Sequence, residues 1–454
     1  MWTELAGVLI AALSALLLVI AFWHHPRFAL VAWLLSLAMV PVWFSVDFVV
    51  SVPAHSVIAV LAIASTVSRT RPTVTKYDYY FATFITISFA AVLFGGSSAG
   101  LWSEIVLQWA VPFVAARVLI AAAGVQFSID AIATILSVVA ILAIIEFLFQ
   151  WHPFVNLNSM SLQFEYWHAI QIRDGTDRSE WAFGHSIALG GSLALSIPFI
   201  IRSSFSSAIK IAMLVCVGAG IVTTASRGAL IAAGLTAVIC MVYVSKARIL
   251  RTATLSISLI VGVVATSALG RLVQTWTRGG SKEEQWSYDH RDDLYTTYLP
   301  AIEWFGKSPI YRTDGSGYYS TDSALLRIGL QFGWIVLLLA VIALASIAFR
   351  VIAGRASTPE IALVGQLPLF TTVALITQYQ SMIFIVAGFA VHMASAREQS
   401  LDSALASAGH SLDPAHTARG PIEKLAKRPH RLHRMASPGR RSLHALPARG
   451  TGVS

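Results

Sequence analysis

The sequence is divided into repeated apolar runs, each about as long as a membrane-spanning helix. The hydrocarbon core of a bilayer is roughly 30 Å thick, so a helix needs about 20 predominantly apolar residues to cross it. Such runs occur at residues 5–23, 28–45, 47–67, 79–94, 104–123, 131–150, 183–201, 210–225, 229–245, 252–270, 324–349, 360–378 and 381–395. The sequence therefore predicts an all-α integral membrane protein, a polytopic helical bundle of about 12 or 13 transmembrane helices.

The composition agrees with this architecture and excludes an ordinary cytosolic enzyme. Of the 454 residues, 56% are hydrophobic and 12% are charged, whereas about a quarter are charged in an average soluble domain. The run at 5–23 lacks the basic segment and the small-residue cleavage site of a signal peptide, so we expect it to be retained as a helix. Cys216 and Cys240 lie inside apolar runs and are expected to be free, buried thiols.

Basic residues in the short loops predict the orientation, because Lys and Arg are retained on the cytoplasmic side of a membrane. Five loops fall on alternate sides of the predicted helices and hence on one face: Arg27; Arg69, Arg71 and Lys76; Arg202 and Lys210; Lys246, Arg248 and Arg251; Arg350 and Arg355. If that face is cytoplasmic, the N-terminus lies outside.

This orientation divides the chain into helical and polar parts. Helices are expected in 1–150, 183–270 and 323–395, with a first external loop at 151–182 and a large external loop at 271–322. Residues 396–454 are rich in Ser, Ala, Pro, His, Arg and Lys, and we expect a disordered basic tail on the cytoplasmic side. The basic tail would be attracted to membrane lipids with anionic headgroups.

Arg227 is the most unusual of the predicted external residues. It lies in Thr224-Ala225-Ser226-Arg227-Gly228, between two apolar runs with no room for a loop. The residue is therefore predicted at the outer boundary of the membrane, where the distribution of basic residues disfavours a cation. Either its side chain snorkels to lipid headgroups, or its planar guanidinium binds a phosphate through two hydrogen bonds. Ser226 and Gly228 would then allow a ligand to approach closely.

The first predicted external loop supplies further basic candidates. Arg173 and Arg178 lie within it, and the chain then enters the next helix at Gly184-His185-Ser186. We include Arg173, Arg178, His185 and Ser226 among the candidate substrate-binding residues; the alternative for His185-Ser186 is an ordinary helix start.

The large predicted external loop contains Asp289-His290-Arg291-Asp292-Asp293 and, later, Tyr318 and Tyr319. The acidic residues around His290 are a weak candidate for a metal site, but Arg291 in their midst favours charge pairing, and no metal or other cofactor is expected. The tyrosines are candidates to stack on sugar rings, or to form an interfacial aromatic belt.

The pattern of these segments resembles the O-antigen ligase and O-antigen polymerase family of integral-membrane glycan-assembly proteins. The resemblance covers about residues 150–345. It rests on the segments 183–190, 224–229, Arg291-x-x-Leu294, 307–310, Gly315-x-Gly317 and 322–326, followed by Gly329 and Gly333.

The resemblance implies a glycosyltransferase of cell-envelope polysaccharide biosynthesis in the bacterial plasma (inner) membrane. It implies transfer of a glycan from an undecaprenyl-diphosphate-linked oligosaccharide to a glycan or lipid acceptor at the outer face, without nucleotide, metal or nucleic acid. Arg227 and Arg291 would neutralise the charge that develops on the diphosphate leaving group, and Arg173 and Arg178 would add contacts or orient the donor.

The acceptor hydroxyl needs a base within hydrogen-bond reach. Ligases of this family place a histidine near the start of the span after the large loop, where this chain has Asp322-Ser323. Asp322 is therefore the first candidate base and His290 the second; the alternative is that Asp322 only caps the next helix. The departure from histidine favours a polymerase, or a ligase-like enzyme that acts on another polysaccharide.

Two other classes of function fit a multi-spanning chain: a transporter or flippase for a lipid-linked glycan, and a non-catalytic assembly scaffold. A transporter is expected to carry ionisable residues in mid-membrane and interrupted helices. Arg117 and Glu146 are among the few ionisable residues inside the predicted spans, and both lie near span ends. The sequence thus favours chemistry on one face over passage through the bilayer.

Overall fold

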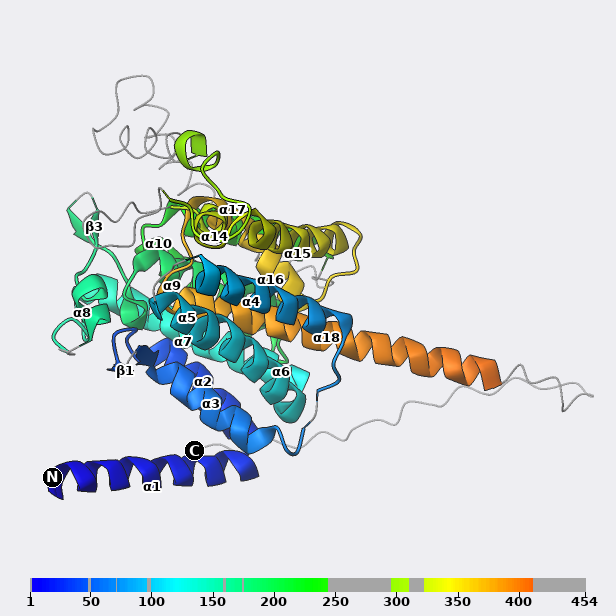
Figure 1. Ribbon diagram of the computed structural model, residues 1–454, viewed down its shortest axis with the longest axis horizontal. Helices are drawn as coiled ribbons and strands as arrows, with labels where there is room; N and C mark the ends of the chain where they lie inside the picture. The colour runs from blue at the N-terminus through cyan, green and yellow to red at the C-terminus, as the bar shows by residue number, and fades with distance from the viewer. Residues whose placement is uncertain are drawn as a thin grey trace, which may run out of the picture. The chain divides into compact units, whose positions relative to one another are not determined.

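The computed structural model describes residues 2–47, 50–70, 72–95, 99–157, 161–173, 175–243, 295–309 and 322–410. Within them the chain is almost entirely helical (Figure 1). The exceptions are two short antiparallel hairpins, β1 (Ser45–Asp47) with β2 (Ser51–Pro53), and β3 (Ile172–Arg173) with β4 (Thr176–Asp177). The prediction of an all-α protein is confirmed.

The helices have the following bounds. They are α1 (Trp2–His24), α2 (Pro26–Met39), α3 (Ala54–Thr66), α4 (Lys76–Phe94), α5 (Ala99–Ser103), the π-helix η1 (Glu104–Ala110), α6 (Val111–Ala123), α7 (Val125–Phe149), α8 (Leu162–Trp167), the 3-10 helix η2 (Trp181–Phe183), α9 (Ser186–Arg202), α10 (Ser207–Thr223), α11 (Arg227–Tyr243), α14 (Ala324–Phe332), α15 (Trp334–Ile352), α16 (Thr358–Gly365), α17 (Leu367–Thr372) and α18 (Thr377–His410).

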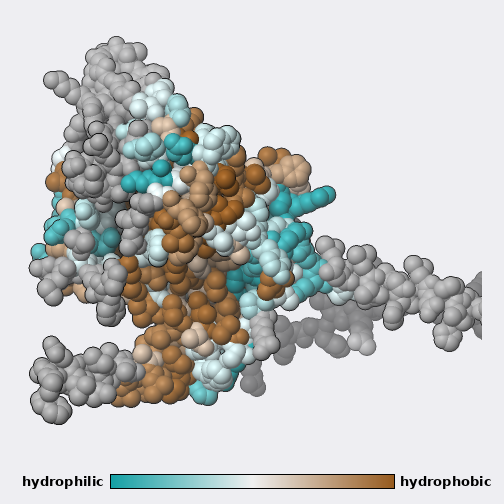
Figure 2. Space-filling model, viewed as in Figure 1, coloured by the Kyte–Doolittle hydropathy of each residue, from teal (hydrophilic) through white to brown (hydrophobic). Residues whose placement is uncertain are grey.

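Five helical stretches among the described residues are long and apolar enough to cross a membrane: Lys76–Phe94, Gly100–Ala123, Val125–Phe149, Trp334–Ile352 and Thr377–Ser400. Six further apolar helices are shorter, with 10–17 residues. Figure 2 shows apolar side chains in a broad band over the middle of one face, with hydrophilic side chains on either side of the band. These features are those of a multi-pass membrane protein.

Helix α9 lies at the centre of the packing. Almost every one of its residues is buried, and it contacts α7, α10, α11 and α16. Its sequence is rich in Gly, Ala and Ser, and such small residues let neighbouring helices approach closely where no hydrophobic effect drives association.

Three of the predicted spans are interrupted in the structure, which corrects the sequence analysis. The run at 324–349 is two helices, because Gly333 has a φ of +91° and separates α14 from α15. The run at 360–378 consists of α16 and α17, which meet at Gln366 and are each too short to cross a bilayer. The run at 47–67 begins in a hairpin, and its helix α3 starts only after Pro53.

The structure describes only part of the expected tail and none of the predicted span at 252–270. Helix α18 continues to His410, so the start of the region predicted to be disordered is helical; its Ala, Leu, Arg, Glu and Gln residues have high helix propensity. Residues 411–454 and the predicted span at 252–270 lie outside the described residues. Both cysteines are free as expected, although only Cys240 is buried and Cys216 is partly exposed.

The basic loops that belong to the described residues lie at one end of the bundle; the loop at 246–251 is outside those residues. Arg27 at the start of α2 donates from Nε to the carbonyl of Ala123 at 3.4 Å. Arg69 after α3 donates to the carbonyl of Trp23 at 2.7 Å. The carbonyl of Arg202 accepts from Gln126 at 3.4 Å. The α1–α2, α3–α4, α6–α7 and α9–α10 connections therefore lie together.

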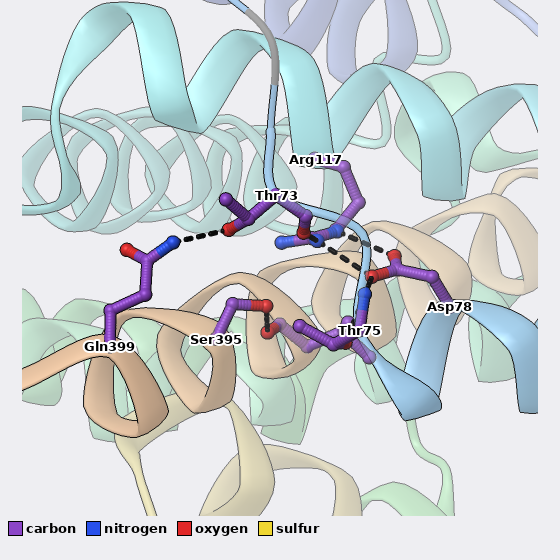
Figure 3. Close-up of polar contacts among 7 residues, drawn as sticks. Thr73, Thr75, Asp78, Arg117, Ser395 and Gln399 are labelled. Atoms are coloured by element: carbon purple, nitrogen blue, oxygen red, sulfur yellow. Dashed lines mark hydrogen bonds and ion pairs between the residues drawn. The ribbon is translucent and has the colours of Figure 1, made fainter. Parts of the chain in front are cut away.

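A buried ion pair fixes the α3–α4 connection at this same end (Figure 3). Arg117 of α6 donates from Nε and Nη2 to the two carboxylate oxygens of Asp78, each at 2.8 Å, and from Nη2 to the carbonyl of Thr73 at 2.7 Å. The Asp78 carboxylate also accepts from the backbone N–H of Thr75, which forms a capping box at the start of α4. Gln399 of α18 donates to the Thr73 hydroxyl at 2.7 Å. Side chains of α6 and α18, together with the capping box at the start of α4, thus fix residues 73–78 in place.

Labelling of single cysteines tests which end faces the cytoplasm. Leu157, 43% exposed in the first polar loop, and Val74, 66% exposed in the basic α3–α4 connection, lie on opposite sides of the predicted membrane. In a background with Cys216→Ala and Cys240→Ala, we expect an impermeant maleimide to label Leu157→Cys in intact cells and Val74→Cys only after permeabilisation. The reverse labelling pattern would mean that the chain is inserted with its basic loops outside.

Candidate functional site

The corner between α10 and α11 lies at the other end of the bundle and holds Arg227. Ser226 caps α11, with its Oγ accepting from the N–H of Ala229 at 3.3 Å, so Arg227 is the first residue of the helix. A cation at the positive end of a helix dipole costs about 0.3–1 kcal/mol. Ala225, just before the cap, has a φ of +46°, a left-handed conformation that costs a non-glycine residue about 1–3 kcal/mol.

The two unfavourable features at one corner indicate that the geometry serves something other than stability. Strained backbone conformations cluster at ligand and catalytic sites. Helix N-termini also attract anions, because their first N–H groups lack partners within the helix. An arginine at this position adds a guanidinium to that field, which suits a phosphate or diphosphate group.

The first polar loop is docked on the same corner. The N–H of Ser179 donates to the carbonyl of Thr223 at 3.2 Å, and Arg178 donates from Nε to the carbonyl of Thr224 at 2.8 Å. Arg178 also donates from Nη1 to the side-chain oxygen of Gln171 at 3.3 Å. The structure therefore places the Arg178 side chain at Thr224, which follows the end of α10 and is three residues before Arg227 in the sequence.

Glu146, at the end of α7, holds this loop in place. Its carboxylate accepts from the N–H groups of Glu180 at 3.2 Å and Trp181 at 2.8 Å, and lies 3.0 Å from Nδ1 of His152. Glu180 is itself buried and accepts from the N–H of Gln171 at 2.9 Å. Burial raises the pKa of Glu180 to about 7, and the nearby charge of Glu146 acts in the same direction.

His185, a candidate for substrate binding, serves as the cap of α9. Its Nδ1 accepts from the N–H of Ile187 at 3.1 Å. Burial lowers the pKa of His185 to about 3, and the charge of Arg178 lowers it further. The ring is therefore neutral at ordinary pH, with one nitrogen already engaged by the backbone.

The start of α14 corrects the alternative for Asp322. The cap of this helix is Ser323, whose Oγ accepts from the N–H of Leu326 at 3.2 Å. Asp322 precedes the cap by one residue and is only partly buried. Its carboxylate is therefore not the N-cap of α14, and a role as cap does not account for the residue.

The segment at residues 371–373, which ends α17, lies between these two helix starts. On one side the N–H of Ala324 donates to the carbonyl of Val373 at 2.8 Å. On the other side Gly228 of α11 lies so close that an added Cβ would be 2.9 Å from Leu369 Cδ2 and 3.7 Å from Thr372 Oγ1. A side chain there would push α11 from α17. Arg227 and Asp322 are thereby brought to two sides of one short segment.

Tyr295, which sequence reasoning missed, closes the same region. Its hydroxyl lies 2.6 Å from the carbonyl of Thr371 and 3.0 Å from the Ser323 hydroxyl. Tyr295 directly follows the segment Arg291-x-x-Leu294 and is four residues after Arg291, a separation close to one turn of a helix. That spacing was the only signal for it in the sequence.

A second missed feature is the ion pair of Arg327 with Glu104. Arg327, one turn into α14, donates from Nη2 to Glu104 Oε2 at 2.9 Å and from Nη1 to the carbonyl of Leu375 at 2.7 Å. Glu104 begins the π-helix η1, and π-helical turns are frequent at functional sites. The two residues are separated by 223 positions, so no local pattern reveals the pair.

The remaining predicted residues are less well placed. Arg173 lies in strand β3, but its side chain lies outside what the structure describes, as do Arg291, His290, Tyr318 and Tyr319 entirely. Among the described residues there is no group of three or more His, Cys, Asp or Glu side chains that would hold a metal ion; the acidic segment around His290 falls outside them.

Comparison with known proteins identifies the region that carries these features. Residues 212–341 match the family model described as O-antigen ligase. That stretch includes the α10–α11 corner, Asp322 and α14; Arg173, Arg178 and His185 precede it. Searches of curated proteins and of solved structures found no match.

The strain at Ala225 makes a testable prediction about this corner. Glycine adopts positive φ without steric cost, so Ala225→Gly is expected to raise the stability of the purified protein by about 1 kcal/mol. Ala219→Gly, at an exposed position inside α10, is the matched control and should lower stability by about 1 kcal/mol, the usual penalty for glycine in a helix. The midpoint of thermal unfolding in one detergent measures both. A lower midpoint for Ala225→Gly would contradict the left-handed geometry.

Proposed function

We propose that the protein is a member of the O-antigen ligase-like family, whose model matches residues 212–341, and that it is a membrane glycosyltransferase acting on lipid-linked glycans. The proposed donor is an oligosaccharide on undecaprenyl diphosphate, and the proposed acceptor is a glycan or lipid at the outer face of the bacterial plasma membrane. The reaction extends or ligates a cell-envelope polysaccharide.

The observation that carries the proposal is the convergence of two helix starts on one segment. Arg227 begins α11, Asp322 precedes the cap of α14, and residues 371–373 lie between them. A glycosyl transfer from a diphosphate needs a positive group at the leaving oxygen and a base at the acceptor. This end of the bundle offers both kinds of group at the boundary of apolar helices, where a lipid diphosphate would lie.

The proposed reaction requires no metal. The acceptor oxygen attacks the anomeric carbon, its proton passes to the Asp322 carboxylate, and the bond from the anomeric carbon to the diphosphate oxygen breaks. The released diphosphate gains negative charge. Arg227, with Arg291 as its proposed partner, stabilises that charge most strongly in the transition state, because preorganised cations act where charge develops.

The other basic candidates have supporting roles in this proposal. Arg178 is engaged with the carbonyl of Thr224, so it would shape the corner and add positive potential rather than carry the reaction. Arg173 would orient the donor from the first polar loop. His185 and Ser226 cap α9 and α11, and would act on substrate by fixing those helix starts. Tyr318 and Tyr319 would stack on the glycan.

A flippase for a lipid-linked glycan is the second candidate, and the interrupted helices favour it. The α14–α15 and α16–α17 pairs are broken, as are many transporter helices near their substrates. The discriminating experiment reconstitutes the full chain in liposomes with an undecaprenyl-diphosphate oligosaccharide. Longer or transferred glycans on a gel support the transferase, whereas movement of unchanged donor across the bilayer supports the flippase.

Substitution of Arg227 tests the diphosphate contact. A lysine cannot reproduce a guanidinium that donates two parallel hydrogen bonds, so Arg227→Lys should be nearly as damaging as Arg227→Ala. Both are expected to lower the transfer rate by about 10²- to 10³-fold, the usual cost of one preorganised contact to a developing anion. Arg202→Lys, on an exposed arginine at the opposite end of α9, is the control and should retain the wild-type rate. Full activity in Arg227→Ala at normal protein levels would remove the phosphate contact.

Substitution of Asp322 separates a base from a structural residue. Because Ser323 is the cap, Asp322→Asn should leave folding unchanged but lower turnover by about 10²- to 10⁴-fold, the typical contribution of a general base. Asp322→His should keep partial activity with a pH optimum moved toward the imidazole pKa of about 6.5. Ser323→Ala is the matched control and should lose about 1 kcal/mol of stability while keeping the base. Wild-type turnover in Asp322→Asn would transfer the role to His290.

A further inference from the structure

Two buried carboxyl groups line one small pocket beneath the first polar loop, and the proposed reaction uses neither of them. Glu146, in the last turn of α7, is 2% exposed, and Glu180, just before η2, is 4% exposed. His152 and His168 line the same pocket. Carboxyl groups are almost never buried this fully unless they are paired, so the partners of each group indicate what it does.

The two carboxyl groups differ in the hydrogen-bond donors around them. The Glu146 carboxylate accepts from the N–H groups of Glu180 and Trp181 and lies 3.0 Å from Nδ1 of His152. Among the described residues, the Glu180 carboxyl has one donor, the N–H of Gln171 at 2.9 Å. Because donors stabilise a charged carboxylate, Glu146 is the better suited of the two to carry the negative charge, and Glu180 to carry a proton.

The surroundings of Glu180 favour its protonated form. Burial raises the pKa of Glu180 from its usual 4.5 to about 7, and the charge of Glu146 acts in the same direction, against the N–H of Gln171 and the charge of Arg178. The titratable and charged groups in and around the pocket, among the described residues, are Glu146 of α7, His152 after α7, His168 after α8, and Asp177 and Arg178 at the end of the β3–β4 hairpin. A proton on Glu180 leaves one buried negative charge in the pocket instead of two.

Gln171 connects Glu180 with Arg178. Gln171 and Arg178 close the base of the β3–β4 hairpin, where the N–H of Arg178 donates to the carbonyl of Gln171 at 3.1 Å. The side-chain oxygen of Gln171 accepts from Nη1 of Arg178 at 3.3 Å and from the Ser186 hydroxyl at 2.8 Å. The Glu180 carboxyl, bound to the N–H of the same glutamine, thus fixes the residue that orients the Arg178 guanidinium.

Arg178 in turn is bound to the α10–α11 corner. Its Nε donates to the carbonyl of Thr224 at 2.8 Å. The next residue, Ser179, donates from its N–H to the carbonyl of Thr223 at 3.2 Å. The loop is therefore joined to the end of α10 through residues 178–180, the same short segment that carries the buried carboxyl.

We propose that Glu180 is a positioning residue for the proposed transfer reaction, which holds Arg178 against the α10–α11 corner while its carboxyl is protonated and releases the loop when it ionises. Ionised Glu180 places a second negative charge in a pocket whose donors already serve Glu146, and an uncompensated buried charge is costly. The inference rests on the proposed function for the role of the corner in the reaction, whereas the docking of the loop is a property of the chain alone.

The direction of the pH dependence follows from the raised pKa of Glu180. Between pH 4.5 and about 7 the docked loop keeps a proton that an undocked loop, with an ordinary glutamate, releases. Docking is therefore most favourable at low pH and weakens as the pH rises through this range. For these two pKa values, the equilibrium constant for undocking rises about tenfold between pH 6 and pH 8.

Hydrogen–deuterium exchange of the purified full chain, without substrate, tests the proposal. Protection of the peptides that cover residues 168–183 is measured from pH 6 to pH 8 and corrected for intrinsic exchange rates. We expect protection to fall about tenfold in the wild type. It should stay constant in Glu180→Gln, whose amide oxygen can accept from Gln171 but whose side chain cannot ionise. Glu165→Gln, on an exposed carboxylate of α8 in the same loop, is the matched control and should keep the wild-type pH dependence.

Two outcomes of the exchange experiment would overturn the proposal. Constant protection in the wild type would show that no ionisation releases the loop, and a pH dependence that persists in Glu180→Gln would assign the transition to His152 or His168.

The transfer assay with the same variants tests the positioning role. We expect the transfer rate of the wild type to fall from pH 6 to pH 8 and that of Glu180→Gln to fall less. Identical pH profiles of the two rates would overturn the positioning role. Absence of any transfer by the wild type, together with the expected exchange, would contradict the proposed function and support the proton-linked docking of the loop.

Discussion

Every backbone N–H and carbonyl inside a membrane has to find a partner within the protein, because lipid offers none. A helix can therefore be interrupted only where other segments supply those partners. At the break around Gly333, residues of the preceding loop do so: the N–H groups of Gly306 and Ser308 donate to the carbonyls of Phe332 and Leu330, and the N–H of Trp334 donates to the carbonyl of Glu303. Residues 303–308 thus provide hydrogen-bond partners for the backbone groups at the end of α14.

The same constraint explains the buried amide and carboxylate side chains around the candidate site. Gln378, at the start of α18, donates from its amide to the carbonyls of Val40 and Ala182 at 3.0 and 2.8 Å, where α2 and η2 end. Glu146 accepts the N–H groups of Glu180 and Trp181. These side chains substitute for the missing helical hydrogen bonds. Their pairing satisfies backbone groups at the end of α2 and in the segment that leads into α9.

Hydropathy alone predicted the helices that are continuous, such as α7 and α10, but not the interruptions. The runs at 324–349 and 360–378 are apolar throughout, and the decisive features are the φ of Gly333 and the junction at Gln366, which leave hydropathy unchanged. Asp322 and Ser323 are both good cap residues, so the sequence could not say which one caps α14. The place of Arg227 between two apolar runs is visible in the sequence, whereas the pairing of Arg327 with Glu104 joins residues too distant in sequence for any local pattern.

The two ends of the bundle differ in how their arginines relate to the helix dipoles. At the basic end, Arg202 and Arg350 lie in the last turns of α9 and α15, where the negative end of the dipole stabilises a cation. At the other end Arg227 occupies the first position of α11, where the dipole opposes it, directly after the strained Ala225. Charge placed against the dipole is compensated when an anion binds, because the helix N-terminus and the guanidinium then act on it together. An anion at the α10–α11 corner would be attracted by the helix N-terminus and the guanidinium together, which is the reason for placing the donor phosphate there in the proposed function.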